Sequence, residues 1–251
     1  MTDLGPAAST AGHADGGRDA PFGAFALPAP WGLLRWLGGN PSGVLGRAVG
    51  HRLAARLSGP VDIVTENRLR LRLHPAESAD ARALIVGGPT WRRVERVKLR
   101  RAIAKRDEFA FVDLGAGDGI FSLDVLATAQ ALGRRATVTA IEPSADARAR
   151  LAENLAHNGF SATIHPATDH GAAASLLAGL PRIDALKIEA AAAVPTLEAF
   201  FAEAPKAAWP RLILSATGRA DPSRLIPFLA SHTYRLVART TLNAMMELSP
   251  R

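Results

Sequence analysis

Three glycines at alternate positions follow an apolar run in the segment FVDLGAGDGIF, residues 111–121. A buried strand that ends in bare backbone can bring a ligand close to the main chain, and it can equally make a tight turn. The spacing G-x-G-x-G differs from the G-x-G-x-x-G that cradles a pyrophosphate. Asp113, two residues before the first glycine, supplies a carboxylate that can meet an ammonium group. The pattern therefore favours a cofactor with an amino-acid end and no pyrophosphate.

Carboxylates after the next two apolar runs strengthen this prediction. Glu142 ends the run ATVTAIEP, where it can accept hydrogen bonds from both hydroxyls of a ribose, and Asp169 follows the third run, where it can meet an adenine amino group. S-adenosylmethionine (SAM) combines all three parts. The alternatives are a tight turn for the glycines, a solvent-facing strand end for Glu142 and an ordinary loop for Asp169. The predicted cofactor-binding residues are Asp113, Gly115, Ala116, Gly117, Gly119, Glu142 and Asp169.

Short apolar runs alternate with helix-length segments from FAFVDLG at residue 109 to RLILSAT at residue 211. The runs are apolar throughout, as in parallel strands that are covered on both faces. This alternation predicts a doubly wound, mostly parallel, Rossmann-like α/β sheet with right-handed crossovers. The segment TYRLVARTTLNAMMELSP, residues 233–250, holds two more extended runs with no helix between them. It predicts an antiparallel hairpin at one edge of the sheet.

The chain as a whole divides into three parts. Residues 1–28 are rich in Gly, Ala, Pro and Asp, a composition that predicts a disordered tail. Residues 29–59 form an amphipathic helical segment, in which apolar residues recur every four positions at Leu45, Val49, Leu53 and Leu57. This segment either packs on the main domain or lies on an anionic membrane surface through 29–58. The cofactor-binding domain is expected over 60–251 and begins with a small hairpin at VDIV and NRLRLRLHP.

The chain of 251 residues carries a net charge of +7 and has no cysteine. The basic excess favours anionic partners such as phosphate groups, nucleic acid or acidic lipids, and a genomic composition bias is the alternative explanation. No apolar stretch reaches the roughly 18 residues of a membrane span. A secretory signal pattern is also missing at the start of the sequence. These features, with the lack of a disulfide framework, fit a cytoplasmic protein.

Basic residues concentrate in TWRRVERVKLRRAIAKRDE, residues 90–108. Its apolar residues predict a helix with one buried stripe, made of Trp91, Val94, Val97 and Ile103. A nucleic-acid-binding helix and an ordinary solvated helix both fit this pattern. The solvated helix is favoured because no aromatic residues interleave with the basic ones as stacking platforms.

Taken together, the motifs resemble the FkbM family of SAM-dependent methyltransferases. The resemblance covers about 61–251 and rests on RLRLRLHPAES, FVDLGAGDGIFSL, AIEPSADARARLAENLAHNG, RIDALKIE, WPRLILSATGR and YRLVARTTLN. It implies the seven-stranded class I methyltransferase fold and O-methylation of a small, lipid-linked or sugar-linked hydroxylated acceptor. It also implies that Asp113 and the glycines line the methionine end of SAM and that Glu142 holds the ribose.

The sequence departs from the family in the half that would face the acceptor. The family motif KIDVEGAE is replaced by KIEAAAAVP, so that Glu189 is the only carboxylate left at the end of that strand. Gly117 stands where the family usually has Asn, and Ser215 stands where it often has Glu. The cofactor half of the motif set is therefore more complete than the acceptor half.

Methyl transfer requires alignment of the acceptor oxygen, the methyl group and the sulfur, and a hydroxyl acceptor benefits from a base. Glu189 is the predicted catalytic base, with Asp169 and His170 as the other candidates. No metal-ligand spacing is present, so a metal-independent site is expected. Two alternatives stay open. One is a degenerate methyltransferase fold that binds SAM or a partner without turnover, and the other is an RNA-binding methyltransferase that uses the basic helix at 91–106.

Overall fold

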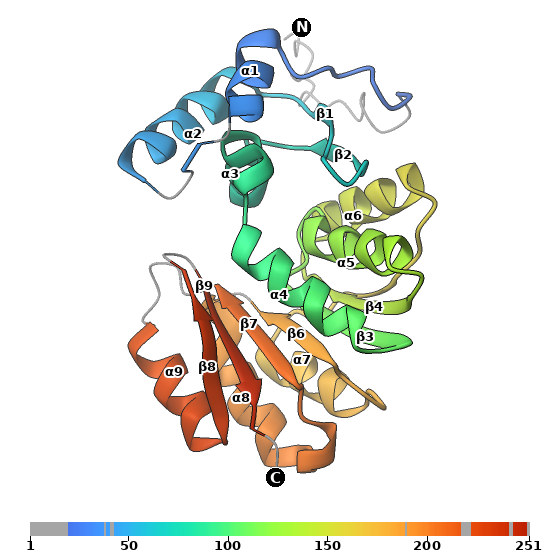
Figure 1. Ribbon diagram of the computed structural model, residues 1–251, viewed down its shortest axis with the longest axis vertical. Coiled ribbons are helices and arrows are strands. Elements are labelled where there is room, and N and C mark those ends of the chain that lie inside the picture. Colours follow the sequence, from blue (N-terminus) through green and yellow to red (C-terminus); the bar gives the residue numbers. More distant parts are fainter. Residues whose placement is uncertain are drawn as a thin grey trace, which may run out of the picture.

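A seven-stranded sheet with the order β5-β4-β3-β6-β7-β9-β8 forms the centre of the protein (Figure 1). The computed structural model describes residues 20–37, 39–40, 43–188, 190–216, 222–240 and 243–249. The strands of this sheet are β3 (Glu108–Leu114), β4 (Arg135–Ile141), β5 (Thr163–His165), β6 (Ala185–Ile188), β7 (Leu212–Ala216), β8 (Tyr234–Arg239) and β9 (Asn243–Leu248). Strands β3 to β7 pair in parallel, whereas β9 pairs antiparallel with β7 and β8. The predicted doubly wound sheet with an antiparallel C-terminal hairpin is confirmed.

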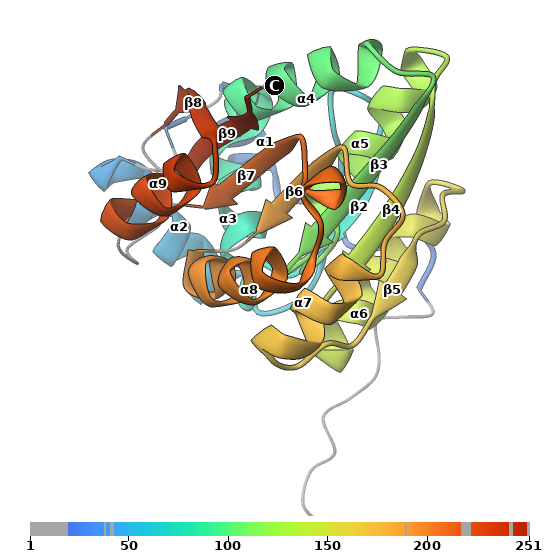
Figure 2. The same ribbon diagram turned by 90° about the horizontal axis from the view of Figure 1, so that it is seen from below.

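Helices cover both faces of this sheet because the buried side chains of each strand point alternately to its two sides. Phe111 of β3 belongs to a core with α4 and α5, whereas the next residue, Val112, belongs to a core with α7 and α8. Figure 2 shows α4 and α5 on one side of the sheet and α7 and α8 on the other. The helices of this part are α4 (Arg93–Ala104), α5 (Ile120–Ala131), α6 (Ala145–His157), α7 (His170–Ala178), α8 (Ala190–Glu203) and α9 (Pro222–Ser231), with a short helix η2 (Lys206–Ala208).

A smaller N-terminal layer packs against this part of the protein. It contains α1 (Ala29–Leu37), α2 (Val44–Arg56), the expected antiparallel hairpin of β1 (Val61–Val64) and β2 (Arg70–Leu73), α3 (Ala79–Gly87) and a short helix η1 (Gly88–Thr90). Helix α2 buries Leu53, while Leu45 is 79% exposed. The four-residue pattern thus predicted a helix correctly, but only part of the apolar stripe is covered. No helix among the described residues is long and apolar enough to cross a membrane.

Buried polar contacts tie the start of the described chain to this layer. The Arg72 side chain is 1% exposed and lies 2.9 Å from Asp62 Oδ1 and 2.6 Å from Glu153 Oε1 of α6. Asp62 Oδ2 also accepts a hydrogen bond of 2.7 Å from Gly23 N, and the Phe25 ring lies 4.7 Å from the Arg72 guanidinium. The prediction of a disordered tail over 1–28 is therefore wrong for residues 20–28. Composition missed this contact because the Asp62–Arg72 pair that holds the segment lies about 40 residues further along the chain. Residues 1–19 lie outside the described residues.

The prediction of a buried apolar stripe along α4 is also wrong in part. Trp91 and Ile103 are buried as expected, but Val94 and Val97 are 44% and 41% exposed. Glu95 takes an inward position instead and is 2% exposed. A buried carboxylate is tolerated there because its Oε1 accepts hydrogen bonds from Asn243 Nδ2 and from Thr240 Oγ1, the latter at 3.2 Å. These partners lie about 150 residues away in sequence, so the local pattern of α4 gave no sign of them.

Candidate active site

The order of the strands reverses between β3 and β6. From β3 the chain continues to β4 and β5 on one side, and from β6 it continues to β7 on the other. In open α/β sheets, ligands bind beyond the carboxyl ends of the strands at such a reversal, because the connections that follow the two strands run to opposite sides. The segment D-x-G-x-G-x-G follows β3 at this point, and Glu189 follows β6. Glu189 itself lies outside the described residues.

The glycine loop contains two kinds of glycine. Gly117 and Gly119 both have positive φ angles, +54° and +79°. A Cβ atom at Gly119 would lie 2.1 Å from Leu151 Cδ1 of α6, so this glycine allows the loop to pack against a helix. A Cβ atom at Gly117 would meet no atom within 4 Å. The backbone at Gly117 consequently borders open space, whereas Gly119 serves the tight turn.

Glu142 lies directly against this loop. It follows β4, is 7% exposed, and its Oε2 accepts a hydrogen bond of 2.8 Å from Gly117 N. Its Oε1 accepts one of 3.0 Å from Ser144 N, in the residue that caps α6. Two backbone donors hold the carboxylate in place, and each oxygen keeps a second lone pair for a further donor. The structure therefore brings the predicted ribose carboxylate and the open glycine together.

Asp113 has an ammonium partner within the protein. Its side chain is fully buried, and Lys187 Nζ of β6 lies 3.2 Å from Asp113 Oδ1. Ser122 Oγ donates to Asp113 Oδ2 at 2.8 Å, and Lys187 Nζ donates to Gly115 O at 2.5 Å. Asp113 and Lys187 together orient the first turn of the glycine loop across the boundary between β3 and β6. A role for Asp113 toward the ammonium group of a ligand stays a prediction.

The other predicted site residues have structural partners. Ala116 is buried, and its N–H donates to Ile141 O at 3.4 Å. Asp169 is exposed and caps α7, where its Oδ1 accepts a hydrogen bond of 2.7 Å from Ala172 N. His170 Nδ1 lies 3.1 Å from Thr196 Oγ1 and thereby joins α7 to α8. The cap explains why an aspartate stands at this position without any ligand.

A polar cluster around Arg92, next to Lys187, was missed by sequence reasoning. The Arg92 guanidinium donates to Asp80 Oδ1 at 2.8 Å and to Asn243 Oδ1 at 2.7 Å. It lies 5.1 Å from the centre of the Phe121 ring, and Lys187 Nζ lies 5.9 Å from the same ring. Burial opposes ionisation of Asp80, but the positive charges of Arg92 and Lys187 outweigh it and lower the pKa of Asp80. The cluster joins α3, α5, β6, β9 and the residue that precedes α4, and no short motif in the sequence predicts it.

Comparison with solved structures places this fold among methyltransferases, although no protein-family model and no curated protein sequence matches the chain. A SAM-dependent methyltransferase from Agrobacterium tumefaciens aligns over 78% of this chain and 71% of that chain, with 12% identity and a TM-score of 0.54. A precorrin-6y C5,15-methyltransferase from Geobacter metallireducens aligns over 66% and 91%, with 17% identity and a TM-score of 0.47. The ribosomal protein L11 methylase of Lactobacillus delbrueckii subsp. bulgaricus aligns over 62% and 79%, with 17% identity and a TM-score of 0.44. The strand order and the first of these similarities show the class I SAM-dependent methyltransferase fold.

Proposed function

We propose that this protein is a SAM-dependent methyltransferase of the FkbM type that methylates a hydroxyl group of a small, lipid-linked or sugar-linked acceptor. The observation that carries the proposal is the contact of Glu142 with Gly117, because it joins a ribose-binding carboxylate to an open stretch of backbone at the point where the strand order reverses. The resemblance of several motifs to the family supports the choice of a hydroxyl acceptor.

The residues present fit SAM. Glu142 accepts hydrogen bonds from the ribose, Gly117 allows close approach of the ligand to the backbone, and Asp169 offers its second oxygen to the adenine amino group. SAM, when bound, supplies an activated methyl group on a sulfonium. The protein then has to hold the acceptor in line and to receive its proton. We assign the role of proton acceptor to Glu189, since it comes directly after β6 in the sequence and His170 already contacts Thr196.

Calorimetry with SAM and S-adenosylhomocysteine tests the cofactor site. We expect both ligands to bind, and Glu142→Ala to weaken binding by about 1–3 kcal/mol, the usual loss for charge-assisted hydrogen bonds. Glu203→Ala, which removes an exposed carboxylate at the end of α8, is the matched control and should bind as the wild type does. Absence of heat with both ligands in folded protein would contradict the proposal.

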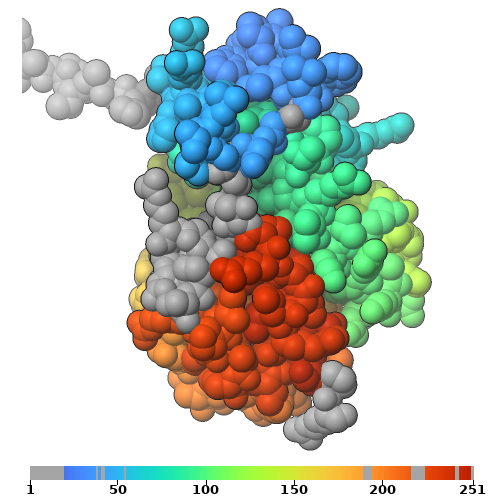
Figure 3. All heavy atoms as spheres, turned by 60° about the vertical axis from the view of Figure 1, so that its left-hand side comes forward, coloured from blue at the N-terminus to red at the C-terminus, as the bar shows by residue number. Residues whose placement is uncertain are grey.

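The N-terminal helices support an acceptor that lies on a membrane. Large apolar side chains are exposed at the end of α1 and the start of α2, with exposed fractions between 58% and 79% for Leu33, Trp36, Leu37, Val44 and Leu45. Exposed arginines, Arg52 and Arg56, lie on α2 as well. Figure 3 shows these helices as the outer blue surface at the N-terminal end. Apolar side chains combined with arginine fit the surface of an anionic bilayer.

Sedimentation with lipid vesicles tests this second part of the proposal. The protein should bind vesicles that contain phosphatidylglycerol more tightly than vesicles of phosphatidylcholine alone, because its arginines attract anionic headgroups. Trp36→Ser with Leu45→Ser should abolish most of the binding, while SAM affinity stays unchanged. Equal sedimentation of this variant and the wild type would show that the helices do not bind the membrane.

A further inference from the structure

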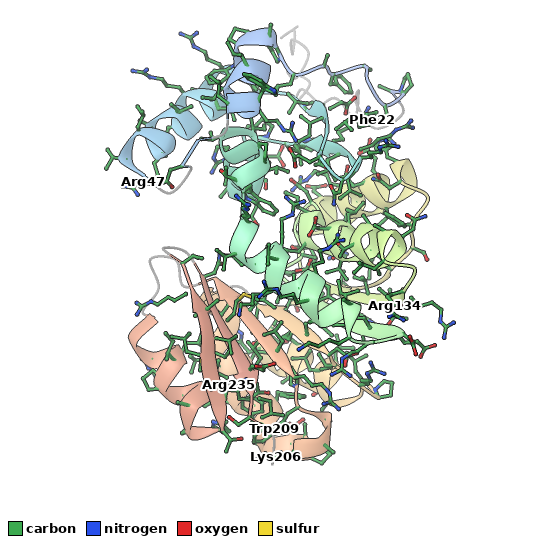
Figure 4. The ribbon with its side chains drawn as sticks, in the orientation of Figure 1. Phe22, Arg47, Arg134, Lys206, Trp209 and Arg235 are labelled. Carbon is green, nitrogen blue, oxygen red and sulfur yellow. The ribbon has the colours of Figure 1, made fainter. Side chains whose placement is uncertain are left out.

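A groove lies at the end of the sheet opposite to the glycine loop. Two cavities of about 530 and 570 Å³ share Arg106, Arg211, Arg235 and Glu247 in their walls and therefore form one continuous groove. Its walls include the starts of β3 and β7, whereas the glycine loop follows the end of β3. Strand β3 has seven residues, which separates the two places by about 20 Å at 3.3 Å per residue. Figure 4 shows Arg235, Trp209 and Lys206 at this end of the protein.

The groove is strongly basic, and its charges come from distant parts of the chain. Helix α4 contributes Lys98 and Arg101, and its C-cap residue is Lys105; the other basic residues of the walls are Arg106, Lys206, Arg211 and Arg235. Asp184 and Glu247 are the acidic residues of these walls. Seven basic side chains against two acidic ones leave a net charge of +5 within one groove. The described part of the groove thus has a much larger ratio of basic to acidic residues than the whole chain, which has 30 Lys and Arg against 23 Asp and Glu.

One buried carboxylate contacts two arginines of the groove, Arg106 and Arg211, and a third, Arg182, that lies outside its walls. The Asp184 side chain is fully buried; its Oδ1 lies 3.2 Å from Arg106 Nε and 3.9 Å from Arg211 Nε, and its Oδ2 lies 2.5 Å from Arg182. Ala110 N also donates to Oδ2, at 2.9 Å. A single carboxylate cannot neutralise three guanidinium groups or accept from all of their donors. Because the side chains of Arg211 and Arg106 are 65% and 30% exposed, donors remain on the groove side for an anionic ligand.

An aromatic side chain completes the groove. Trp209 lies in its wall, half-buried, and the Lys206 ammonium lies 5.7 Å from the centre of the indole. Phe201 packs against the indole at 4.5 Å, and Trp209 Nε1 donates to Ala204 O at 3.1 Å, so the ring is held rigidly. Helix α4 has no aromatic residue among its own basic ones. The tertiary structure supplies one from a segment about 100 residues further along the chain.

We propose that this groove binds single-stranded nucleic acid. A groove lined by many cations can bind successive phosphates of a nucleic-acid backbone, and a rigid aromatic ring in its wall can stack against a base. A flat lipid surface fits a concave, charged wall less well than a flexible polyanion does. Since the groove and the glycine loop lie at opposite ends of the sheet, the nucleic acid docks here without entering the proposed methyl-transfer site. The proposal is thus independent of the proposed function.

Fluorescence anisotropy with a labelled oligouridylate of about 12 nucleotides, a length that single-strand-binding folds cover, tests the proposal on the full chain. The test variant is Arg101→Gln with Lys105→Gln. The matched control is Arg93→Gln with Arg100→Gln, which removes the same charge from exposed positions of the same helix outside the groove. We expect roughly tenfold weaker binding for the test variant, and a salt slope smaller by about 1.4, because each lost phosphate contact lowers the slope by about 0.7.

The control variant should keep the affinity of the wild type within about twofold, since its charges do not contact the phosphates. If both variants weaken binding equally, only the net charge attracts the oligonucleotide, and the groove is not its binding site. Absence of binding at low salt would overturn the proposal as well. The affinity for anionic vesicles is measured in parallel. If the test variant loses more affinity for these vesicles than for the oligonucleotide, the groove is a lipid site and the assignment to nucleic acid is wrong. Melting curves check that all variants are folded.

Discussion

The charged side chains at the two ends of the central sheet differ in burial and in pairing. At the carboxyl ends of the strands, the charged groups are buried and paired, as in Asp113 with Lys187 and Glu142 with the backbone of Gly117. At the amino ends, exposed basic side chains outnumber acidic ones and surround a groove. One end is therefore suited to a ligand that is recognised by orientation, and the other to a ligand that is recognised by charge.

This difference has consequences for both binding and stability. Buried paired groups are screened little by salt, and they contribute strongly to folding because removal of one partner leaves the other without compensation. Exposed cations contribute little to folding and bind anions in a manner that salt weakens. Substitutions of the buried groups at the carboxyl end should thus change stability or cofactor binding, and substitutions of the exposed cations at the amino end should change only the binding of anions.

The largest effect is expected from the buried ion pair. Lys187→Met leaves the fully buried Asp113 carboxylate without its ammonium and should lower the free energy of unfolding by about 3–5 kcal/mol. Urea denaturation measures it. The double variant Lys187→Met with Asp113→Asn should recover part of the loss, because the uncompensated charge is gone. A loss by Lys187→Met below about 1 kcal/mol, the range of exposed pairs, would show that the two ends do not differ in this respect.

The two glycines of the loop allow a finer comparison within the carboxyl end. Both Gly117→Ala and Gly119→Ala place a side chain at positive φ, which costs about 1–2 kcal/mol. Only Gly119→Ala also forces an atom against Leu151, an overpacking that costs about 1–3 kcal/mol more. Chemical denaturation should therefore rank Gly119→Ala as the less stable protein, while calorimetry should show the greater loss of SAM affinity for Gly117→Ala. The reverse ranking would contradict this assignment, because Gly117 would then serve packing and Gly119 would serve ligand binding.

The smallest effect concerns Asp80. The positive charges of Arg92 and Lys187 lower the pKa of its carboxyl group in the folded protein, so its contribution to stability is present above its ordinary value of 3.8 and is lost as the pH falls through the folded value. Asp80→Asn should therefore reduce stability near neutral pH, and its difference from the wild type should shrink in acid. Denaturation curves at several pH values test this. A difference that stays constant down to strongly acidic pH would show that Asp80 acts through packing alone.

Much of the carboxyl end was predictable from the sequence. A buried parallel strand followed by glycines, and a carboxylate at the end of the next strand, must meet at one edge of the sheet because parallel strands share their direction. The contact of Glu142 with Gly117 follows from that rule. The alternation of strands and helices likewise predicted the sheet, since apolar runs without a polar face require cover on both sides.

The rest was decided by tertiary structure. Lys187 reaches Asp113 across the boundary of β3 and β6, Asn243 reaches Glu95 of α4 from 148 residues away, and the docking of 20–28 depends on a buried aspartate and arginine further along the chain. The basic groove is likewise assembled from α4, η2, the starts of β3, β7 and β8, and the end of β9. Local patterns determine which elements form, because side-chain periodicity acts within a single helix or strand. Contacts between elements depend on how these pack, and a buried charge is stable only where that packing delivers its partner.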